Sequence, residues 1–284
     1  MSQRLRIVTD STADLPAKLI TDYGITVVPL NVHFGEEVLK DGEDIWAEEF
    51  YHRLKNEVHL PNTSQPSPAE FARVYEQLAG EADCIFSIHI SEKLSGTLSS
   101  AHMAAEMVKD KVKVVVVDSQ VVSMGLGLIA LAAARAAAAG ADSAAVEAEI
   151  KRAQAQLSLY FTVETLAHLN RTGRIGKASA LLGSLLNIRP ILSLADGTII
   201  PAEKYRGSSA KANVRLLELL GEDMAGRPCW VALVHADAPA EAERLKGLIP
   251  SYLEARETHI SFVGPIVGVH AGPGTIGIMA LPVA

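Results

Sequence analysis

The chain has few of the residues that mark several classes of protein. It contains two cysteines, Cys84 and Cys229, which lie far apart within apolar runs and form no Cys-x-x-Cys motif. Such cysteines are typically small buried hydrophobes, and the sequence predicts no disulfide framework. Aromatic residues are 5% of the chain and hydrophobic residues 49%, so we expect a sizeable core built mainly from aliphatic side chains.

An excess of positive charge is also missing. The net charge is −7, and an acidic surface argues against nucleic-acid binding and against an electrostatic membrane anchor. The most apolar stretch, residues 121–139, contains Ser123 and Arg135. We interpret it as a buried helix, because a membrane span needs ~20 apolar residues. The first residues show no signal-peptide pattern, so we expect a cytoplasmic protein with no membrane span.

In residues 1–155, apolar runs of strand length alternate with helical patterns. Continuous apolar runs are typical of parallel strands that are covered by helices on both faces. The alternation predicts an α/β fold that begins with a Rossmann-like parallel-sheet domain. The predicted strands are residues 4–9, 25–32, 83–90 and 112–117, and the predicted helices start near Leu15, Trp46 and Pro68.

The pattern changes in residues 156–284. Asp196-Gly197 stands between two apolar runs, which is a strong signal for a two-residue hairpin and therefore for antiparallel pairing. We predict a C-terminal α+β two-layer domain and a domain boundary near residue 155. Its predicted strands are residues 159–163, 188–194, 198–204, 230–235, 259–263 and 275–281.

Motifs for nucleotides, metals and hydrolysis fail at required positions. Gly125-Leu-Gly127 fits part of the dinucleotide pattern but does not follow a strand directly, so close helix packing is the better interpretation. A P-loop at Gly176-Lys177 would need glycine where Arg171 stands and serine or threonine where Ala178 stands. No His-Glu-x-x-His or Gly-x-Ser-x-Gly motif occurs. We therefore expect no metal, no cofactor and no catalytic residue.

Four clusters of small and hydrogen-bonding residues carry more information. Each could do no more than cap a helix or make a turn. The second gains weight because it follows a predicted parallel strand and opens a helix, where ligands bind and where backbone N–H groups suit an anion. The clusters are Thr63-Ser64-Gln-Pro-Ser67, Ser91 to Ser100 with Ser95-Gly96-Thr97 at its centre, Asn170 to Gly176 with Lys204-Tyr-Arg206, and Gly264 to Gly274.

The order and spacing of these residues resemble the DegV family from end to end. The matching segments are Ile7 to Leu15, Thr63 to Ser67, Leu94 to Thr97, Asp118-Ser119, Gly173-Arg174-Ile175, Lys204 to Arg206 and Gly264 to Gly274. One departure is Thr172, where the family often has glycine.

The resemblance implies a carrier that binds a long-chain fatty acid, such as hexadecanoate, in a tunnel between the two domains. An ATP-dependent fatty acid kinase would then phosphorylate the carboxylate, and the acyl-phosphate would enter phospholipid synthesis. By the motif match, Thr63 and Ser95 would hydrogen-bond the carboxylate and His270 would lie close to it. Ser64, Gly96 and Thr97 belong to the same loops, and Arg206, Arg174 and Arg171 would support the site or dock the kinase.

Physical chemistry agrees with that picture. A carboxylate removed from water needs several donors, and each buried CH₂ of an acyl chain contributes ~0.8 kcal/mol. The apolar helix at 126–139, or the run 180–186, could line the tunnel. Because His270 lies in a Gly-rich segment, we expect a loop there.

Two other hypotheses remain open. One is a stand-alone hydrolase of acyl esters, which would need Ser95 in contact with His270 and an acid to orient the histidine. The other is a regulatory protein that binds another amphiphile.

Overall fold

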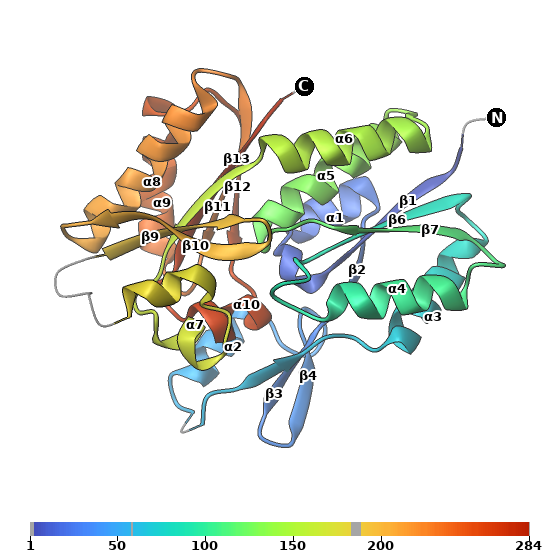
Figure 1. Cartoon of the computed structure of the whole chain (residues 1–284), viewed down its shortest axis with the longest axis horizontal. Coiled ribbons are helices and arrows are strands. Elements are labelled where there is room, and N and C mark those ends of the chain that lie inside the picture. Colours follow the sequence, from blue (N-terminus) through green and yellow to red (C-terminus); the bar gives the residue numbers. More distant parts are fainter. Residues whose placement is uncertain (1–2, 58, 183–188, 284) are drawn as a thin grey trace.

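The computed structural model describes residues 3–57, 59–182 and 189–283. A four-stranded parallel sheet with the order β2-β1-β6-β7 forms the first half (Figure 1). Its strands are β1 (Leu5–Asp10), β2 (Thr26–Val28), β6 (Cys84–His89) and β7 (Lys113–Asp118). The Rossmann-like parallel sheet is therefore confirmed.

Helices cover both faces of this sheet, as its continuous apolar strands predict. The helix that starts at Pro68 is confirmed, and Ser67 and Glu70 form a capping box at its N-terminus. The helices of the first half of the chain are α1 (Ala17–Tyr23), α2 (Ala47–Leu54), α3 (Pro68–Ala79), α4 (Thr97–Met107), α5 (Met124–Ala138) and α6 (Ser143–Gln156), with a 3-10 turn at Ser11–Ala13.

The predicted single strand at residues 25–32 is wrong, because the segment divides between two sheets. β2 ends at Val28, and β3 (Asn31–Phe34) pairs antiparallel with β4 (Glu37–Lys40) and β5 (Asn62–Ser64). Pro29 lacks a backbone N–H and cannot continue a ladder. The N–H of Leu30 instead bonds the Ser11 hydroxyl at 3.1 Å. The result is a small third sheet that the sequence did not predict.

A six-stranded mixed sheet with the order β10-β9-β8-β13-β11-β12 forms the second half. The Asp196-Gly197 hairpin is confirmed: Ala195 pairs with Thr198, and both turn residues have positive φ. The start of the strand predicted at residue 188 lies outside the described residues. The strands are β8 (Ser158–Thr162), β9 (Arg189–Ala195), β10 (Thr198–Tyr205), β11 (Cys229–His235), β12 (Ala255–Phe262) and β13 (Ile276–Pro282).

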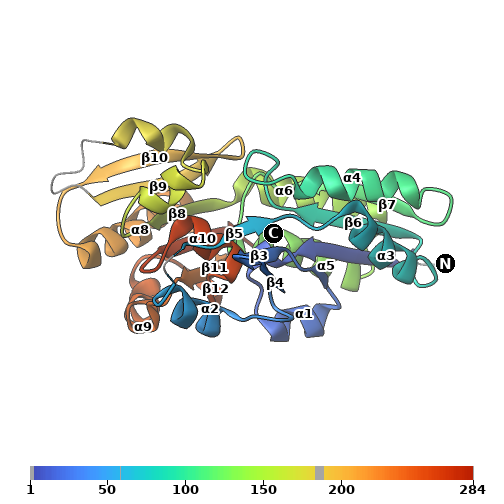
Figure 2. The same ribbon diagram turned by 90° about the horizontal axis from the view of Figure 1, so that it is seen from below.

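Helices α8 (Ser209–Met224) and α9 (Pro239–Leu248) pack on one face of the six-stranded sheet around a core that includes Leu216 and Leu233. The other face meets α5 and the first half of the chain. Short helices α7 (Ala167–Arg171) and α10 (Pro265–Ala271) complete the fold, with 3-10 turns at Gly176–Leu181 and Ile249–Ser251. Seen from below, α10 lies beside β3 and β5 between the two halves (Figure 2). The domain boundary near residue 155 stays a prediction.

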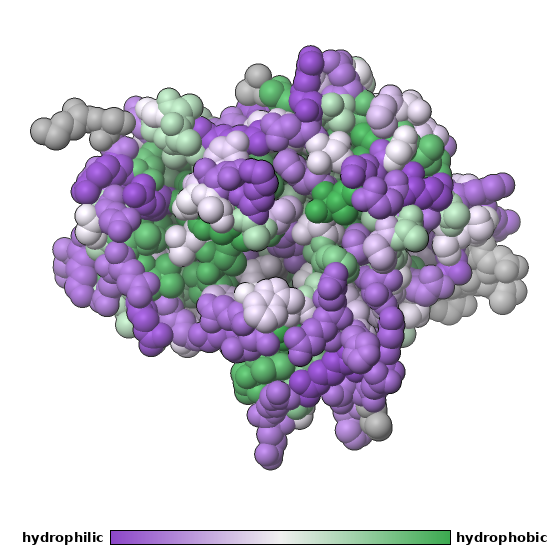
Figure 3. Space-filling view, turned by 180° about the vertical axis from the view of Figure 1, so that it is seen from behind, coloured by the Kyte–Doolittle hydropathy of each residue, from purple (hydrophilic) through white to green (hydrophobic). Residues whose placement is uncertain are grey.

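The surface seen from behind is mostly hydrophilic and is interrupted by apolar patches (Figure 3). Within the described part of the chain, no helix combines the length and hydropathy needed to cross a bilayer. Gly127 of the rejected dinucleotide motif packs tightly, because a Cβ there would come within 2.7 Å of the Ala13 carbonyl oxygen. The interpretation of this glycine as a packing residue is confirmed.

A buried polar network closes the carboxyl end of the parallel sheet. Asp10 accepts hydrogen bonds from the backbone N–H groups of Thr12 (3.0 Å) and Ile90 (3.1 Å), and its Oδ2 lies 2.9 Å from Nδ1 of His89. Nε2 of His89 lies 2.6 Å from Oγ of Ser87. This is the residue set of a hydrolytic triad, but Asp10, Ser87 and His89 are each 0% exposed, so the network is structural.

We expect Asp10→Ala to lower the free energy of unfolding by about 3 kcal/mol, because several buried donors would lose their acceptor at once. Chemical denaturation followed by circular dichroism measures this. The matched control is Asp22→Ala, which removes an exposed pair with Lys18 and should change stability by less than ~0.5 kcal/mol. Equal losses for the two variants would contradict the structural role of Asp10.

Candidate functional site

One cavity is lined by most of the predicted site residues. It offers about 930 Å³ of space free of protein atoms, part of which opens to solvent. Polar groups from three elements line it: Thr63, Ser64 and Gln65 at β5, Ser95 before α4, and His270 on α10. Ser123, Arg174 and Thr275 also line it, and the rest of the lining is apolar. Such a cavity suits a ligand with one polar end and a long apolar body.

The apolar lining comes from both halves of the chain, mainly from the inner face of the six-stranded sheet. The predicted lining role of the helix at 126–139 is wrong, because the residues of that segment are buried in the core and do not face the cavity. Residues 183–186 of the alternative run 180–186 lie outside the described residues, and residues 180–182 do not line the cavity. The apolar lining residues are Leu30, Ile90, Leu94, Val122, Leu159, Phe161, Leu169, Leu194, Ile199, Val234, Val263, Ile266, Val267, Ala271 and Met279.

The two hydroxyl-rich loops predicted to converge do lie together. Gln65 follows Thr63 and Ser64, and its side-chain amide packs on Gly96, where an added Cβ would be 3.0 Å from Nε2. Thr63 and Ser95 line the same cavity. Gly96 and Thr97 do not line it. Thr97 is fully buried and supports Ser95, because the two hydroxyls lie 2.9 Å apart.

Ser95 stands at the start of α4. Its hydroxyl oxygen accepts the backbone N–H of Thr97 at 3.3 Å, so the side chain is held where the positive end of the helix begins. An anion at Ser95 would gain from that helix end.

His270 belongs to helix α10, so the expected loop is wrong. Gly268 gives no flexibility there; it allows close packing, because a Cβ at Gly268 would lie 2.6 Å from the Tyr51 hydroxyl on α2. The glycines around His270 thus bring α10 against its neighbours. As a result, the imidazole projects from a fixed helix toward β5.

Nε2 of His270 lies 2.9 Å from Oγ1 of Thr63, whereas Nδ1 is buried and has no hydrogen-bond partner among the described residues. Burial, followed by the charges of Arg174 and Arg171, lowers the pKa of His270 to about 4. The ring is therefore neutral at pH 7. With its proton on Nε2 it donates to Thr63 and leaves no buried N–H orphaned, and the Thr63 hydroxyl is then free to donate its own proton.

The three predicted arginines fall into different places. Arg174 lines the cavity and is fixed by the carbonyls of Leu94 (3.2 Å) and Thr172 (2.6 Å). Arg171 ends α7 and is close enough to influence His270, although it does not line the cavity. Arg206 is exposed after β10 and is also outside the cavity lining. No described acidic side chain forms an ion pair with any of the three.

Two residues that contribute to the site, His33 and Asp14, were not predicted from the sequence. His33 on β3 places Nε2 2.8 Å from Oγ of Ser64, so the second cavity hydroxyl also has an imidazole partner. Asp14 accepts the Ser123 hydroxyl (2.5 Å) and the Gly264 N–H (2.9 Å), and thereby ties a cavity-lining residue to the start of α10. Only strand register and long-range packing reveal these contacts.

The geometry required for a hydrolase is not present in the described residues. The hydroxyl of Ser95 contacts Thr97, and His270 contacts Thr63, so Ser95 and His270 form no pair. Within the described ranges no three His, Cys, Asp or Glu side chains gather in a way that could hold a metal ion.

Comparison with known proteins places these features in a family. A model described as uncharacterised proteins of the DegV family matches residues 4–283. The chain belongs to the DegV family. A DegV domain-containing protein from Streptomyces coelicolor is 43% identical over 284 residues, which cover 98% of this chain and 99% of the relative. Protein DegV from Bacillus subtilis is 37% identical, with 96% of this chain and 98% of the relative covered.

Solved DegV structures share the fold. A DegV family protein from Thermus thermophilus, described by its fatty acid binding, superposes with a TM-score of 0.93 at 37% identity and covers 99% of this chain and 100% of its own. Bacillus subtilis DegV, described as a fatty acid binding protein, gives 0.90 at 36% identity, with 99% and 100% covered. The α/β architecture with two separate sheets is therefore that of the DegV family.

We expect His270 to stay neutral down to about pH 4 in histidine side-chain NMR titrations. Because this pKa lies below that of the unfolded chain, ~6.5, the unfolded state binds more protons between the two values. The contribution of His270 to stability is therefore lost as pH falls through that window. His270→Gln assigns the signal, and a transition near the ordinary value would contradict the burial of the ring.

Proposed function

We propose that this DegV protein binds one long-chain fatty acid in the cavity, with the carboxylate at Thr63, Ser95 and His270. The observation that supports this most is the cavity itself, whose lining is mostly apolar and includes the hydroxyls of Thr63 and Ser95 and the neutral imidazole of His270. The related proteins described as fatty acid binding share this fold over nearly their full length.

Hydrogen bonding explains how the head group could leave water. With the imidazole proton on Nε2, His270 donates a hydrogen bond to the Thr63 hydroxyl, which can then donate its own to a carboxylate oxygen. Ser95 can donate to the other oxygen from the start of α4, and Arg174 supplies positive charge beside them. Several donors together offset the desolvation of a carboxylate, which none of them could do alone.

The acyl chain supplies most of the binding free energy. Each methylene buried against the aliphatic lining contributes ~0.8 kcal/mol, so a long chain binds strongly and a short one weakly. The polar end then fixes orientation rather than affinity. Such a separation of affinity from orientation favours a carrier, which would hold the acyl chain in the cavity and leave the carboxylate accessible from solvent.

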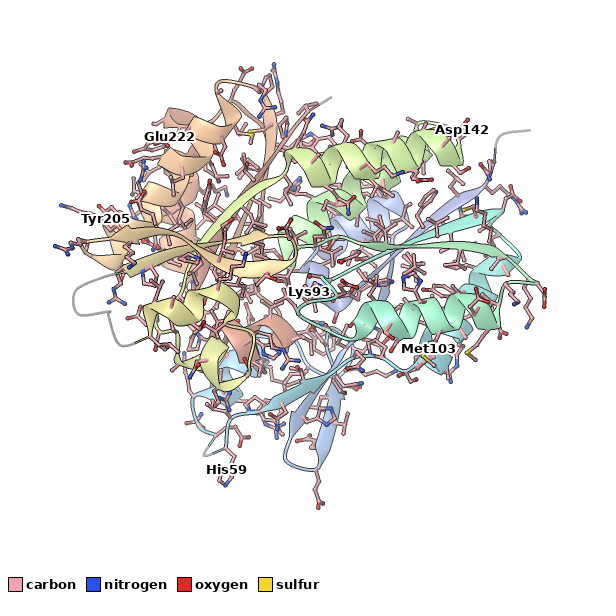
Figure 4. All side chains as sticks on the ribbon, in the orientation of Figure 1. His59, Lys93, Met103, Asp142, Tyr205 and Glu222 are labelled. Carbon is pink, nitrogen blue, oxygen red and sulfur yellow. The ribbon has the colours of Figure 1, made fainter. Side chains whose placement is uncertain are left out.

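The proposed next step is phosphorylation of that carboxylate by a separate ATP-dependent fatty acid kinase, which would feed acyl-phosphate to phospholipid synthesis. Arg206 is exposed and outside the cavity lining, which suits docking rather than lipid binding. Its neighbour Tyr205 lies at the outer end of the β9–β10 hairpin, well away from Lys93 in the loop that leads to Ser95 (Figure 4). A kinase docked at Arg206 would therefore have to extend from the open end of the hairpin, opposite its turn, toward the site.

We expect Thr63→Val to weaken fatty acid binding roughly 10- to 100-fold, because it removes one hydrogen bond to a charged group and keeps the side-chain shape. Displacement of a fluorescent fatty acid measures the affinity. The control is Thr21→Val on α1, whose hydroxyl bonds only the Ala17 carbonyl. Unchanged affinity in Thr63→Val would place the carboxylate elsewhere.

We expect Arg206→Ala to leave lipid occupancy at the wild-type level and to slow acyl-phosphate formation when kinase and ATP are added. Native mass spectrometry measures occupancy, and acyl-hydroxamate formation measures the product. Arg256→Ala, which removes another exposed arginine, is the control. Loss of lipid from Arg206→Ala would assign this residue to the binding site, and an unchanged rate would remove it from docking.

A further inference from the structure

A second, polar pocket lies directly behind the wall of the fatty acid cavity. It is lined by the loop after β7, the end of α6, and the facing ends of β8 and β9, with Asp223 of α8 at its edge. Its side chains include Ser119, Gln120, Gln154 and Tyr160. Leu159 and Leu194 line both this pocket and the apolar cavity, so their side chains separate the two.

The sheet is open at this point, which is why side chains must form the wall. β8 spans five residues, but its ladder with β9 contains only the pairs Phe161–Leu192 and Thr162–Ile191. Continuing this register places Leu159 opposite Leu194, beyond the last pair. There the Leu159 carbonyl oxygen accepts the Ser193 hydroxyl at 2.9 Å instead of a backbone N–H. The two strands are therefore joined by a side chain, and the leucines fill the opening.

The two leucines are held differently. Leu159 is 6% exposed and wedged against the start of α5, where an added Cβ at Gly125 would come 3.3 Å from its Cδ2. Leu194 is half-buried, and at this position its strand pairs only with β10. The side chain of Leu194 can therefore change its position more easily than that of Leu159.

We propose that Leu159 and Leu194 form the end wall for the acyl chain and set the longest fatty acid that the protein prefers. The inference rests on the proposed function, since it needs the carboxylate at Thr63 and Ser95. A chain that extends away from that polar end gains free energy from each methylene until it meets the wall. Further methylenes would have to displace a leucine and enter a polar, solvated pocket, where the gain per methylene disappears.

The test compares Leu194→Ala with wild type across saturated fatty acids from myristic to behenic acid. Removing three side-chain carbons makes room for roughly two or three more methylenes, so the preferred length should shift upward by about that number. Leu194→Phe extends the wall into the cavity and should shift the preference toward shorter chains. The opposite directions keep the test informative if one variant is unstable.

Leu169→Ala is the matched control, because Leu169 lines the cavity and not the polar pocket. It should weaken binding of all chains without moving the preferred length. An unchanged length profile in both Leu194 variants, or the same shift in Leu169→Ala, would overturn the end-wall assignment. A wild-type protein that binds no fatty acid of any length would instead overturn the proposed function.

Discussion

The cavity depends on one buried carboxylate, that of Asp14. Asp14 is 8% exposed and accepts two hydrogen bonds through its side chain, from Ser123 and from the backbone of Gly264. Its own carbonyl accepts the Ser261 hydroxyl. These contacts join the turn after β1, the start of α5 and the start of α10, and so fix the cavity wall and the helix that carries His270. Burial raises the pKa of Asp14, and the neighbouring Asp41 has a pKa raised to about 7 for the same reason.

The polar end of the cavity uses histidines to orient hydroxyls. Thr63 and Ser64 are adjacent on β5, and each contacts Nε2 of a different imidazole, from α10 and from β3. A hydroxyl has a single proton, so the partner that it bonds decides whether that proton is available to a ligand. At Thr63, the neutral ring of His270 can donate from Nε2, which leaves the hydroxyl proton of Thr63 free. The site thereby gains a hydroxyl donor at Thr63, beside the permanent positive charge of Arg174.

The sequence predicted those parts of the fold that local patterns control. Continuous apolar runs identified the parallel strands, and Asp196-Gly197 identified the hairpin, because both are encoded within a few residues. The division of residues 25–32 between two sheets was missed, since it depends on Pro29 together with a distant hydroxyl on Ser11. The Gly-rich segment around His270 predicts a loop, although Gly268 serves helix packing against Tyr51. The family resemblance named Thr63, Ser95 and His270, but only coordinates show that His33 contacts Ser64 and that Asp14 contacts Ser123 and Gly264.

The contacts of Asp14 also determine when the cavity can exist during synthesis. Ser123 follows Asp14 by 109 residues and Gly264 follows it by 250. Bringing such distant segments together requires loop closure that is entropically unfavourable until many other contacts have formed. The parallel sheet can assemble once β7 has left the ribosome, whereas α10 and β13 come much later in the chain. The cavity therefore cannot be complete in a nascent chain until α10, which carries His270, has been made.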